Sequence, residues 1–243
     1  MEETTKTGRL ILLPNLLGEE GDVGTLPRDL EQVVAGLDGL IAESVGAGRR
    51  FLGRFKLPRP AHLVPLALLN EHSKNSDLEF LLEPVVEGQK WGLVSDAGLP
   101  CIADPGSRLI AKARQLDCSV EAWPGPCSIM IALMLSGLSG QSFTFHGYVC
   151  KESSERKHQI QQWEREAASK EKTTQILMEA PYRNDSLLKE LLEFLQEDTK
   201  LCVAWDLTLP TQGVICQSVK RWKGAVLPVL KGSPALFLFA KGN

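Results

Sequence analysis

The amino-acid sequence predicts an α/β protein built from two domains. Short apolar runs alternate with helical patterns in both halves of the chain, as expected when strands and helices follow one another in an α/β fold. At mid-chain, Trp123-Pro124-Gly125-Pro126 is a stiff break, because its prolines fix the chain direction and remove backbone donors. The length of 243 residues suits two domains. We expect them to span residues 1–122 and 123–243.

The first half is expected to contain short buried strands that end in loops. The strands are predicted at Arg9–Leu13, Leu40–Ala42, the run around Leu93 and Val94, and Cys118–Ala122. Helices are predicted after Pro27, where apolar residues recur at helical spacing, and over Pro105–Leu116. The segments Leu63–Leu69 and Leu78–Val86 contain strand and helix material, and the pattern leaves their order open.

The second half repeats the alternation after a strongly apolar helix at Ser128–Leu135. Further strands are predicted at Phe143–Val149, Thr174–Met178 and Leu201–Trp205, and helices at Ser153–Ala168 and Ser186–Leu195. Val214–Gln217 and Ala235–Ala240 are expected to close the sheet as an antiparallel pair.

The stretch from Trp91 to Ser128 is the first place to look for a small-molecule site. Its apolar run breaks into a loop rich in Gly and Pro, and a helix begins after Asp104-Pro105. Ligands of open α/β sheets lie beyond the carboxyl ends of the strands. Glu43 also follows a predicted strand, as does Glu179 in the second half. The alternative is that the loop only makes turns and that Glu43 is a solvated loop acid.

The segment from Gly48 to Pro60 carries basic side chains and no acidic one, with Phe51 and Phe55 between them. Basic side chains interleaved with aromatic rings suit phosphates and unstacked bases. A solvated charged face is the alternative interpretation. The basic residues are Arg49, Arg50, Arg54, Lys56 and Arg59.

Several classes of function are disfavoured. A net charge of −3 argues against coating nucleic acid through bulk positive charge. The sequence has no P-loop, no Gly-x-Gly-x-x-Gly opening a helix and no Gly-x-Ser-x-Gly elbow. Its six cysteines are scattered without a Cys-x-x-Cys pair, so we expect reduced thiols and no metal site. No apolar run is long enough for a membrane span and the N-terminus is acidic, which favours the cytoplasm.

A series of motifs runs through nearly the whole chain, from about Arg9 to Gly242. They are Leu13-Pro14, Glu43, Val94-Ser95-Asp96-Ala97-Gly98-x-Pro100, Asp104-Pro105-Gly106, Pro124-Gly125-Pro126-Cys127 and Ser136-Gly137-Leu138. In this order the motifs resemble the tetrapyrrole methylase superfamily of S-adenosylmethionine-dependent methyltransferases. Within it they are most similar to the branch of ribosomal small-subunit RNA cytidine 2'-O-methyltransferases.

The resemblance implies two α/β domains with S-adenosylmethionine in the cleft between them, and a homodimer. Carried over by position, it implies cofactor contacts from Pro14, Asp96, Ala97, Gly98, Leu99, Ile102, Cys127, Ser128, Glu179 and Leu207. Glycine allows close approach of the backbone to a bulky ligand, and carbonyls and carboxylates suit a sulfonium cation. A ribose hydroxyl acceptor would benefit from a general base, for which Glu43 is the first candidate and Glu179 the second. Arg49, Arg50, Arg54 and Lys56 are the expected contacts to RNA.

The acceptor side departs from the pattern of the RNA-modifying branch. Where that branch has Glu-Asp-Thr-Arg, this chain has Glu43-Ser44-Val45-Gly46, and Glu-Ser-Thr-His-Arg is replaced by Glu179-Ala180-Pro181-Tyr182-Arg183. Arg-Glu-Leu-Thr-Lys is likewise replaced, by Trp205-Asp206-Leu207-Thr208-Leu209. The chain therefore resembles a divergent sub-branch, for which methyltransferase activity is a safer prediction than any named acceptor. The basic stretch from Arg49 to Arg59 favours ribosomal RNA as the acceptor. A methyltransferase of a tetrapyrrole or other small molecule, and a cofactor-binding protein without catalysis, stay open.

Overall fold

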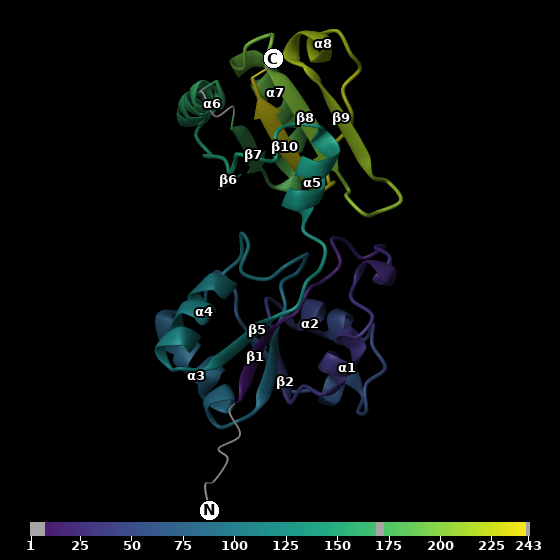
Figure 1. Cartoon of the computed structure of the whole chain (residues 1–243), viewed down its shortest axis with the longest axis vertical. Coiled ribbons are helices and arrows are strands. Elements are labelled where there is room, and N and C mark those ends of the chain that lie inside the picture. The colour runs from purple at the N-terminus through teal and green to yellow at the C-terminus, as the bar shows by residue number, and fades with distance from the viewer. Residues whose placement is uncertain (1–7, 169–172, 242–243) are drawn as a thin grey trace, which may run out of the picture. The chain divides into compact units, whose positions relative to one another are not determined.

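The computed structural model describes residues 8–168 and 173–241, and the chain divides into two compact units, Met1–Cys127 and Ser128–Asn243 (Figure 1). Unit 1 is built on a five-stranded parallel sheet in the order β3-β2-β4-β1-β5. Its strands are β1 (Arg9–Leu12), β2 (Gly39–Ala42), β3 (Leu66–Leu68), β4 (Lys90–Leu93) and β5 (Ser119–Ala122). The segment whose order the sequence left open is thus strand first and helix second.

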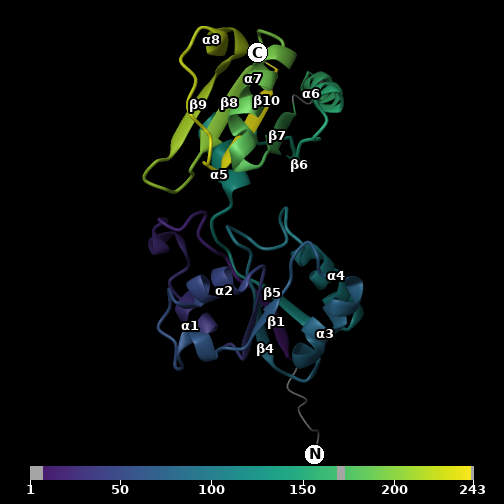
Figure 2. The ribbon, with the colours of Figure 1, turned by 180° about the vertical axis from the view of Figure 1, so that it is seen from behind.

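Helices cover both faces of this sheet, which is why every residue of its interior strand β2 is buried. The helices are α1 (Leu30–Ala35) and α2 (Val45–Leu52) on one face, and α3 (Asn75–Val86) and α4 (Gly106–Gln115) on the other (Figures 1 and 2). Successive residues of a strand point to opposite faces of the sheet, so they pack alternately against the two layers of helices. Ile11 packs with Leu30 and Phe51 on the first face, and Leu10 packs with Leu82 and Leu109 on the second.

Unit 2 contains a mixed sheet in the order β6-β7-β10-β8-β9. Its strands are β6 (Phe143–Tyr148), β7 (Thr174–Met178), β8 (Lys200–Trp205), β9 (Gly213–Ser218) and β10 (Ala235–Ala240). Only β6 and β7 are parallel neighbours. The expected pairing of β9 with β10 is wrong, since β10 lies between β7 and β8 and β9 pairs with β8. Every residue of β10 is buried, so this strand needs neighbours on both sides, whereas the partly exposed β9 suits an edge.

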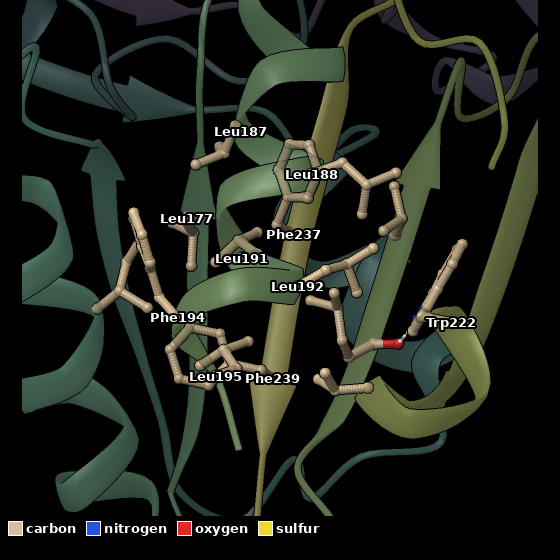
Figure 3. Packing of buried hydrophobic residues seen from close by; sticks show 14 of the residues in the cluster. Leu177, Leu187, Leu188, Leu191, Leu192, Phe194, Leu195, Trp222, Phe237 and Phe239 are labelled. Atoms are coloured by element: carbon tan, nitrogen blue, oxygen red, sulfur yellow. Dashed lines mark hydrogen bonds between the residues drawn. The ribbon is translucent and has the colours of Figure 1, made fainter. Parts of the chain in front are cut away.

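The core of unit 2 lies between its sheet and α7 (Asn184–Phe194). Leu188, Leu191 and Leu192 of this helix pack with Phe237 and Phe239 of β10 (Figure 3). The remaining helices of the unit are α5 (Ser128–Ser136), α6 (Ser153–Ala167) and α8 (Val219–Lys223). Short 3-10 helices lie at Val23–Thr25, Ala61–Leu63 and Pro181–Arg183.

The buried Trp222 of α8 shows how a polar atom is accommodated in this core. Its indole Nε1–H donates to the carbonyl oxygen of Leu201 at 2.8 Å (Figure 3). The ring is therefore buried without an unsatisfied donor. Within the described residues, the helices are too short or too polar to cross a bilayer.

Candidate functional site

The topology of unit 1 points to the carboxyl end of β4. This strand lies between β1 and β2, and the chain leaves those two strands toward α1 and α2 on one face of the sheet. From β4 the chain instead reaches α4 on the opposite face. A reversal of this kind opens a crevice beyond the strand ends, where ligands of open α/β sheets bind.

Three loops meet at this edge through the side chains of Glu43 and Asn15. The Glu43 carboxylate, directly after β2, accepts a hydrogen bond from the backbone N–H of Asp96 at 2.9 Å. Asn15, after β1, donates from Nδ2 to the carbonyls of Ser95 at 2.8 Å and Asp96 at 3.0 Å. Its Oδ1 accepts from Arg54 Nη1 at 2.6 Å. The loops after β1, β2 and β4 are thus fixed to one another.

Asn15 is buried and is a site residue that sequence reasoning missed. The one available signal was its place directly after Pro14 at a predicted strand end. Asn15 also bonds through its backbone, since its N–H donates to the carbonyl of Gly98 at 2.8 Å. The N–H of Gly98 in turn donates to Leu16 at 3.2 Å, so the β1 and β4 loops pair like short strands.

Two glycines allow the loops to approach this closely. Gly98 has a φ of +68°, a left-handed conformation that disfavours side chains, and a Cβ there would lie 3.4 Å from the carbonyl oxygen of Pro126. Gly125 lies against Pro14, where an added Cβ would come within 2.1 Å of the proline Cβ. Both predicted motifs, Ala97-Gly98 and Pro124-Gly125-Pro126, therefore have a packing reason for their glycine.

The loop before α4 is held in a strained conformation by Asp104. Its carboxylate accepts hydrogen bonds from the N–H of Cys101 at 2.8 Å and of Gly106 at 2.7 Å. Cys101 and Ala103 have φ values of 71° and 61°, and left-handed non-glycine residues cost about 1–3 kcal/mol each. Such strain recurs at ligand sites. A recess lined by Glu43, Ser95, Pro100, Asp104 and Gly106, among others, lies beside this loop.

Three carboxyl groups, those of Glu43, Asp96 and Asp104, gather at this edge, with the guanidinium group of Arg54 nearby on Asn15. Burial raises the pKa of Glu43, and the nearby charges of Asp96 and Asp104 raise it further, while the hydrogen bond from Asp96 N–H opposes the rise. Burial likewise raises the pKa of Asp104 against two backbone hydrogen bonds. Carboxylates that are disfavoured in their charged form would be stabilised by a cation, so the edge suits a cationic ligand better than a phosphate.

The other predicted cofactor residues of unit 1 lie on the same loops. Asp96 and Ala97 are exposed, Leu99 is half-buried, and Ile102 is 43% exposed. Side chains on the β4 loop are therefore accessible to a ligand. Cys127 and Ser128, at the boundary of the two units, are both half-buried.

In unit 2, Glu179 and Leu207 lie just beyond the carboxyl ends of β7 and β8. β7 and β8 run in the same direction because both are antiparallel to β10, and these residues follow their carboxyl ends. The buried Glu179 accepts from the N–H of Ala180 at 2.8 Å and forms an ion pair with Arg183 at 3.1 Å.

The loop that carries Leu207 is also strained. Leu207 is buried between Asp206 and Thr208, whose φ values are 48° and 70°. The Asp206 carboxylate accepts hydrogen bonds from Thr211 Oγ1 at 2.9 Å and Ser233 Oγ at 3.0 Å. Each unit therefore has, at a carboxyl edge, a left-handed loop held by an aspartate.

The predicted RNA contacts divide into two kinds. Arg49 donates to the carbonyls of Ala61 and Val64, and Arg54 to Asn15, so these two guanidinium groups hold the protein's own loops. Arg50 is exposed and forms a surface ion pair with Glu19 at 3.0 Å. Lys56 is exposed as well. The structure thus leaves Arg50 and Lys56 as the more available of the four.

Among the residues that the structure describes, no three or more His, Cys, Asp or Glu side chains are grouped so that they could hold a metal ion.

Comparisons with known proteins agree with this architecture. A family model described as Tetrapyrrole (Corrin/Porphyrin) Methylases matches residues 40–221. Ribosomal RNA small subunit methyltransferase I of Vibrio cholerae is 30% identical over 199 residues, which cover 82% of this chain and 65% of that protein. The protein of the same name from Synechocystis is 31% identical over 201 residues, covering 83% and 67%. The chain thus spans about two thirds of the length of these relatives.

A solved structure, the uroporphyrin-III-C-methyltransferase from Thermus thermophilus, matches 97% of this chain and 93% of its own. The TM-score is 0.55 and the sequence identity 18%, so this likeness shows the fold alone.

Proposed function

Because the chain belongs to the tetrapyrrole (corrin/porphyrin) methylases, we propose that it is an S-adenosylmethionine-dependent methyltransferase that modifies ribosomal RNA. The proposed acceptor is the ribose 2'-hydroxyl of a small-subunit cytidine. The observation that carries the proposal is the edge of unit 1 where Glu43, Asp96 and Asp104 gather beside loops that Asn15 ties together. Relatives named ribosomal RNA small subunit methyltransferase I support the RNA acceptor.

The residues at this edge fit the proposed cofactor. S-adenosylmethionine supplies a methyl group already activated on a positively charged sulfur. Three carboxyl groups offset such a charge, and Gly98 leaves the backbone of the β4 loop open to a bulky ligand. The exposed Ala97 and the strained segment from Cys101 to Ala103 provide the remaining surface.

The chain's own contribution to the reaction is alignment, negative potential and a base. Holding the acceptor in line with the methyl group can contribute about 7–11 kcal/mol in the best cases. Glu43 is the proposed general base, because a raised pKa makes a carboxylate a stronger proton acceptor. Glu179 is the second candidate, but its oxygens are engaged by Ala180 N–H and by Arg183.

Arg50 and Lys56 are the proposed contacts to the RNA backbone, since both are exposed on unit 1. We further propose that the protein acts as a homodimer in the cytoplasm, where its ribosomal substrate is found. A small-molecule acceptor is the second candidate. It is favoured by the internal hydrogen bonds of Arg49 and Arg54, which engage two of the four expected RNA contacts, and by the altered Glu179-Ala180-Pro181 segment.

Transfer of labelled methyl groups to small ribosomal subunits that lack the modification tests the proposal. We expect label on one cytidine ribose with the wild-type chain, a loss of about 10²–10⁴-fold with Glu43→Gln, and no change with Glu121→Gln. Glu121 is a matched control because it is half-exposed and pairs with Arg9 at the surface. Cofactor binding without label on RNA would refute the RNA acceptor and favour a small molecule or a chain without catalysis.

A further inference from the structure

Two cysteines of unit 2 face each other across the last pair of strands. In the antiparallel ladder of β8 and β9, Cys202 lies directly opposite Cys216. Both thiols are free. Because the two residues are directly paired, their side chains leave the sheet on the same face.

The hydrogen-bonding pattern shows which kind of pair this is. In the same register, the N–H of Val219 donates to the carbonyl of Thr199 at 2.9 Å, so this pair is hydrogen-bonded. Such pairs alternate with non-hydrogen-bonded ones along an antiparallel ladder. Counting along the chain from Thr199, Leu201 also belongs to a hydrogen-bonded pair and Cys202 to a non-hydrogen-bonded pair. Non-hydrogen-bonded partners have Cα atoms about 4.5 Å apart, which lies within the range that a disulfide spans.

The two thiols differ sharply in access. Cys202 is fully buried, whereas Cys216 is exposed on the edge strand β9. A reagent from solution therefore meets Cys216 first, and Cys202 can react only with its neighbour.

The two thiols also differ in acidity. The hydrogen bond from the Cys202 thiol, together with the charge of Lys200, lowers the pKa of Cys216 to about 7 against the opposing effect of burial. The same hydrogen bond raises the pKa of Cys202, as burial also does. In contrast, burial and then Asp104 raise the pKa of Cys101 to about 12. Cys216 is thus the attacking thiolate and Cys202 the protonated partner.

We propose that Cys202 and Cys216 form a reactive dithiol site that hydroperoxides oxidise reversibly to a cross-strand disulfide. In the first step the Cys216 thiolate attacks the terminal peroxide oxygen, the O–O bond breaks, and the alcohol or water leaves with a proton taken from solvent. Cys216 becomes a sulfenic acid. In the second step the sulfur of Cys202 attacks Cys216, the S–O bond breaks, and water leaves with the proton of the Cys202 thiol. The two sulfurs are together oxidised by two electrons, and the peroxide is reduced.

The position of the pair gives this oxidation a local consequence. The disulfide would close a loop that contains Asp206, Leu207 and Thr208, the strained segment at the end of β8. It would also tie the edge strand β9 covalently to the interior of the sheet.

Treatment of the full chain with hydrogen peroxide, followed by alkylation and peptide mapping, tests the proposal. We expect the wild type to lose the mass of two hydrogens, to yield a linked Cys202–Cys216 peptide, and to recover with dithiothreitol. In the reduced protein we expect Cys216 to be alkylated at least ~10-fold faster than Cys101. Cys150→Ser is the control variant, because Cys150 lies outside the ladder, and it should still form the link.

The single variants separate the two roles. With Cys202→Ser, oxidised Cys216 should stop at the sulfenic acid and be captured by dimedone. With Cys216→Ser, Cys202 should stay reduced. The proposal is overturned if the wild type yields no linked peptide, if Cys216 proceeds to the sulfinic acid instead, or if Cys202 reacts in the absence of Cys216. The wild-type map decides the question even if the Cys202 variant does not fold.

Discussion

At the scale of single residues, Asn15 joins the loops after β1 and β4 to Arg54. Replacing Asn15 by Asp keeps the acceptor for Arg54 but removes the donor to Ser95 and Asp96. We expect Asn15→Asp to weaken S-adenosylmethionine binding about 10-fold or more, because a carboxylate repels the carbonyl oxygens of Ser95 and Asp96 and releases the β4 loop from its binding geometry. Each buried hydrogen bond that is lost leaves a group unsatisfied, which costs about 1–3 kcal/mol. Titration calorimetry with the cofactor measures this loss.

The matched control for this variant is Asn75→Asp. Asn75 also accepts a hydrogen bond from an arginine, Arg108, at 2.7 Å, but does so at an exposed position at the start of α3. Equal loss of affinity in both variants would refute a positioning role for Asn15.

Glu43 is expected to affect stability as well as activity. Its pKa is raised above the ordinary value of 4.5, mainly by burial, so the folded chain binds this proton more tightly than the unfolded chain. The unfolding free energy therefore falls as the pH rises from 4.5 through the raised pKa of Glu43 in the folded chain. The loss of stability from the buried charge persists at neutral pH. Glu43→Gln removes this cost and should stabilise unit 1 at neutral pH by at most about 1 kcal/mol, since solvent screens a part-exposed carboxylate.

Hydrogen exchange of the β2 amides, measured at neutral pH and below pH 4.5, checks this effect. The gain should vanish on the acid side, and a gain of the same size at both pH values would contradict the assignment to Glu43 ionisation. If Glu43 is a functional carboxylate, the Glu43→Gln variant should be more stable and less active than wild type.

Single residues differ in how far the sequence reveals them. The place of Glu43 at a strand end could be predicted from the carboxylate that follows an apolar run, whereas Asp96 was indicated by the family resemblance. Asn15 could not be predicted, because its function depends on contacts with a loop 80 residues away. The same holds for the hydrogen bond from Arg54 to Asn15, which joins an expected RNA contact to the loop after β1.

At the scale of elements, α2 follows Glu43 and its two internal glycines have opposite surroundings. A Cβ on Gly46 would meet only the mobile end of Arg50, at 3.2 Å, whereas one on Gly48 would lie 2.4 Å from Leu66 of β3. We expect Gly46→Ala to stabilise unit 1 by up to about 1 kcal/mol through helix propensity. Gly48→Ala should destabilise it by about 1–3 kcal/mol through overpacking.

Urea unfolding of the two variants beside wild type distinguishes these effects. Stabilisation by both substitutions would show that α2 does not pack closely on β3.

The elements that sequence reasoning missed or mispaired share a physical cause. α2 was not predicted, because its eight residues include two glycines and adjacent arginines that obscure the helical period. The predicted position of β10 is wrong, because an apolar strand indicates burial but does not determine which strands it pairs with. Long periodic segments, such as those that form α4 and α6, were found with nearly their observed bounds.

At the scale of the whole molecule, the net charge of −3 means that RNA must be held by local contacts. Arg50→Gln and Lys56→Gln should each reduce the salt dependence of RNA binding by about one unit of slope. Arg59→Gln is the charge-matched comparison, because Arg59 donates to the carbonyls of Leu37 and Asp38 and is held by the protein itself. Binding measured at several salt concentrations gives the slopes. Equal slopes for all three variants and wild type would refute the proposed contacts.

The family and the two α/β units could be predicted at this scale because ordered motifs extend over the whole chain. For the acceptor, the sequence favours ribosomal RNA but leaves a small molecule open, since the segments that differ from the RNA-modifying branch lie at Glu43-Ser44 and Glu179-Ala180. The contacts that these segments make, such as the ion pair of Glu179 with Arg183, depend on the fold.

The central place of β10 in its sheet has a consequence for synthesis on the ribosome. Unit 1 is built from strands that all precede residue 123, so its sheet can form while the rest of the chain is still being made. In unit 2 the strand that joins β7 to β8 is the last to emerge. Until Ala235–Ala240 is released, β7 and β8 each present an unpaired, apolar edge to the cell. The nascent second unit is thus open to chaperones and to aggregation until its central strand has emerged.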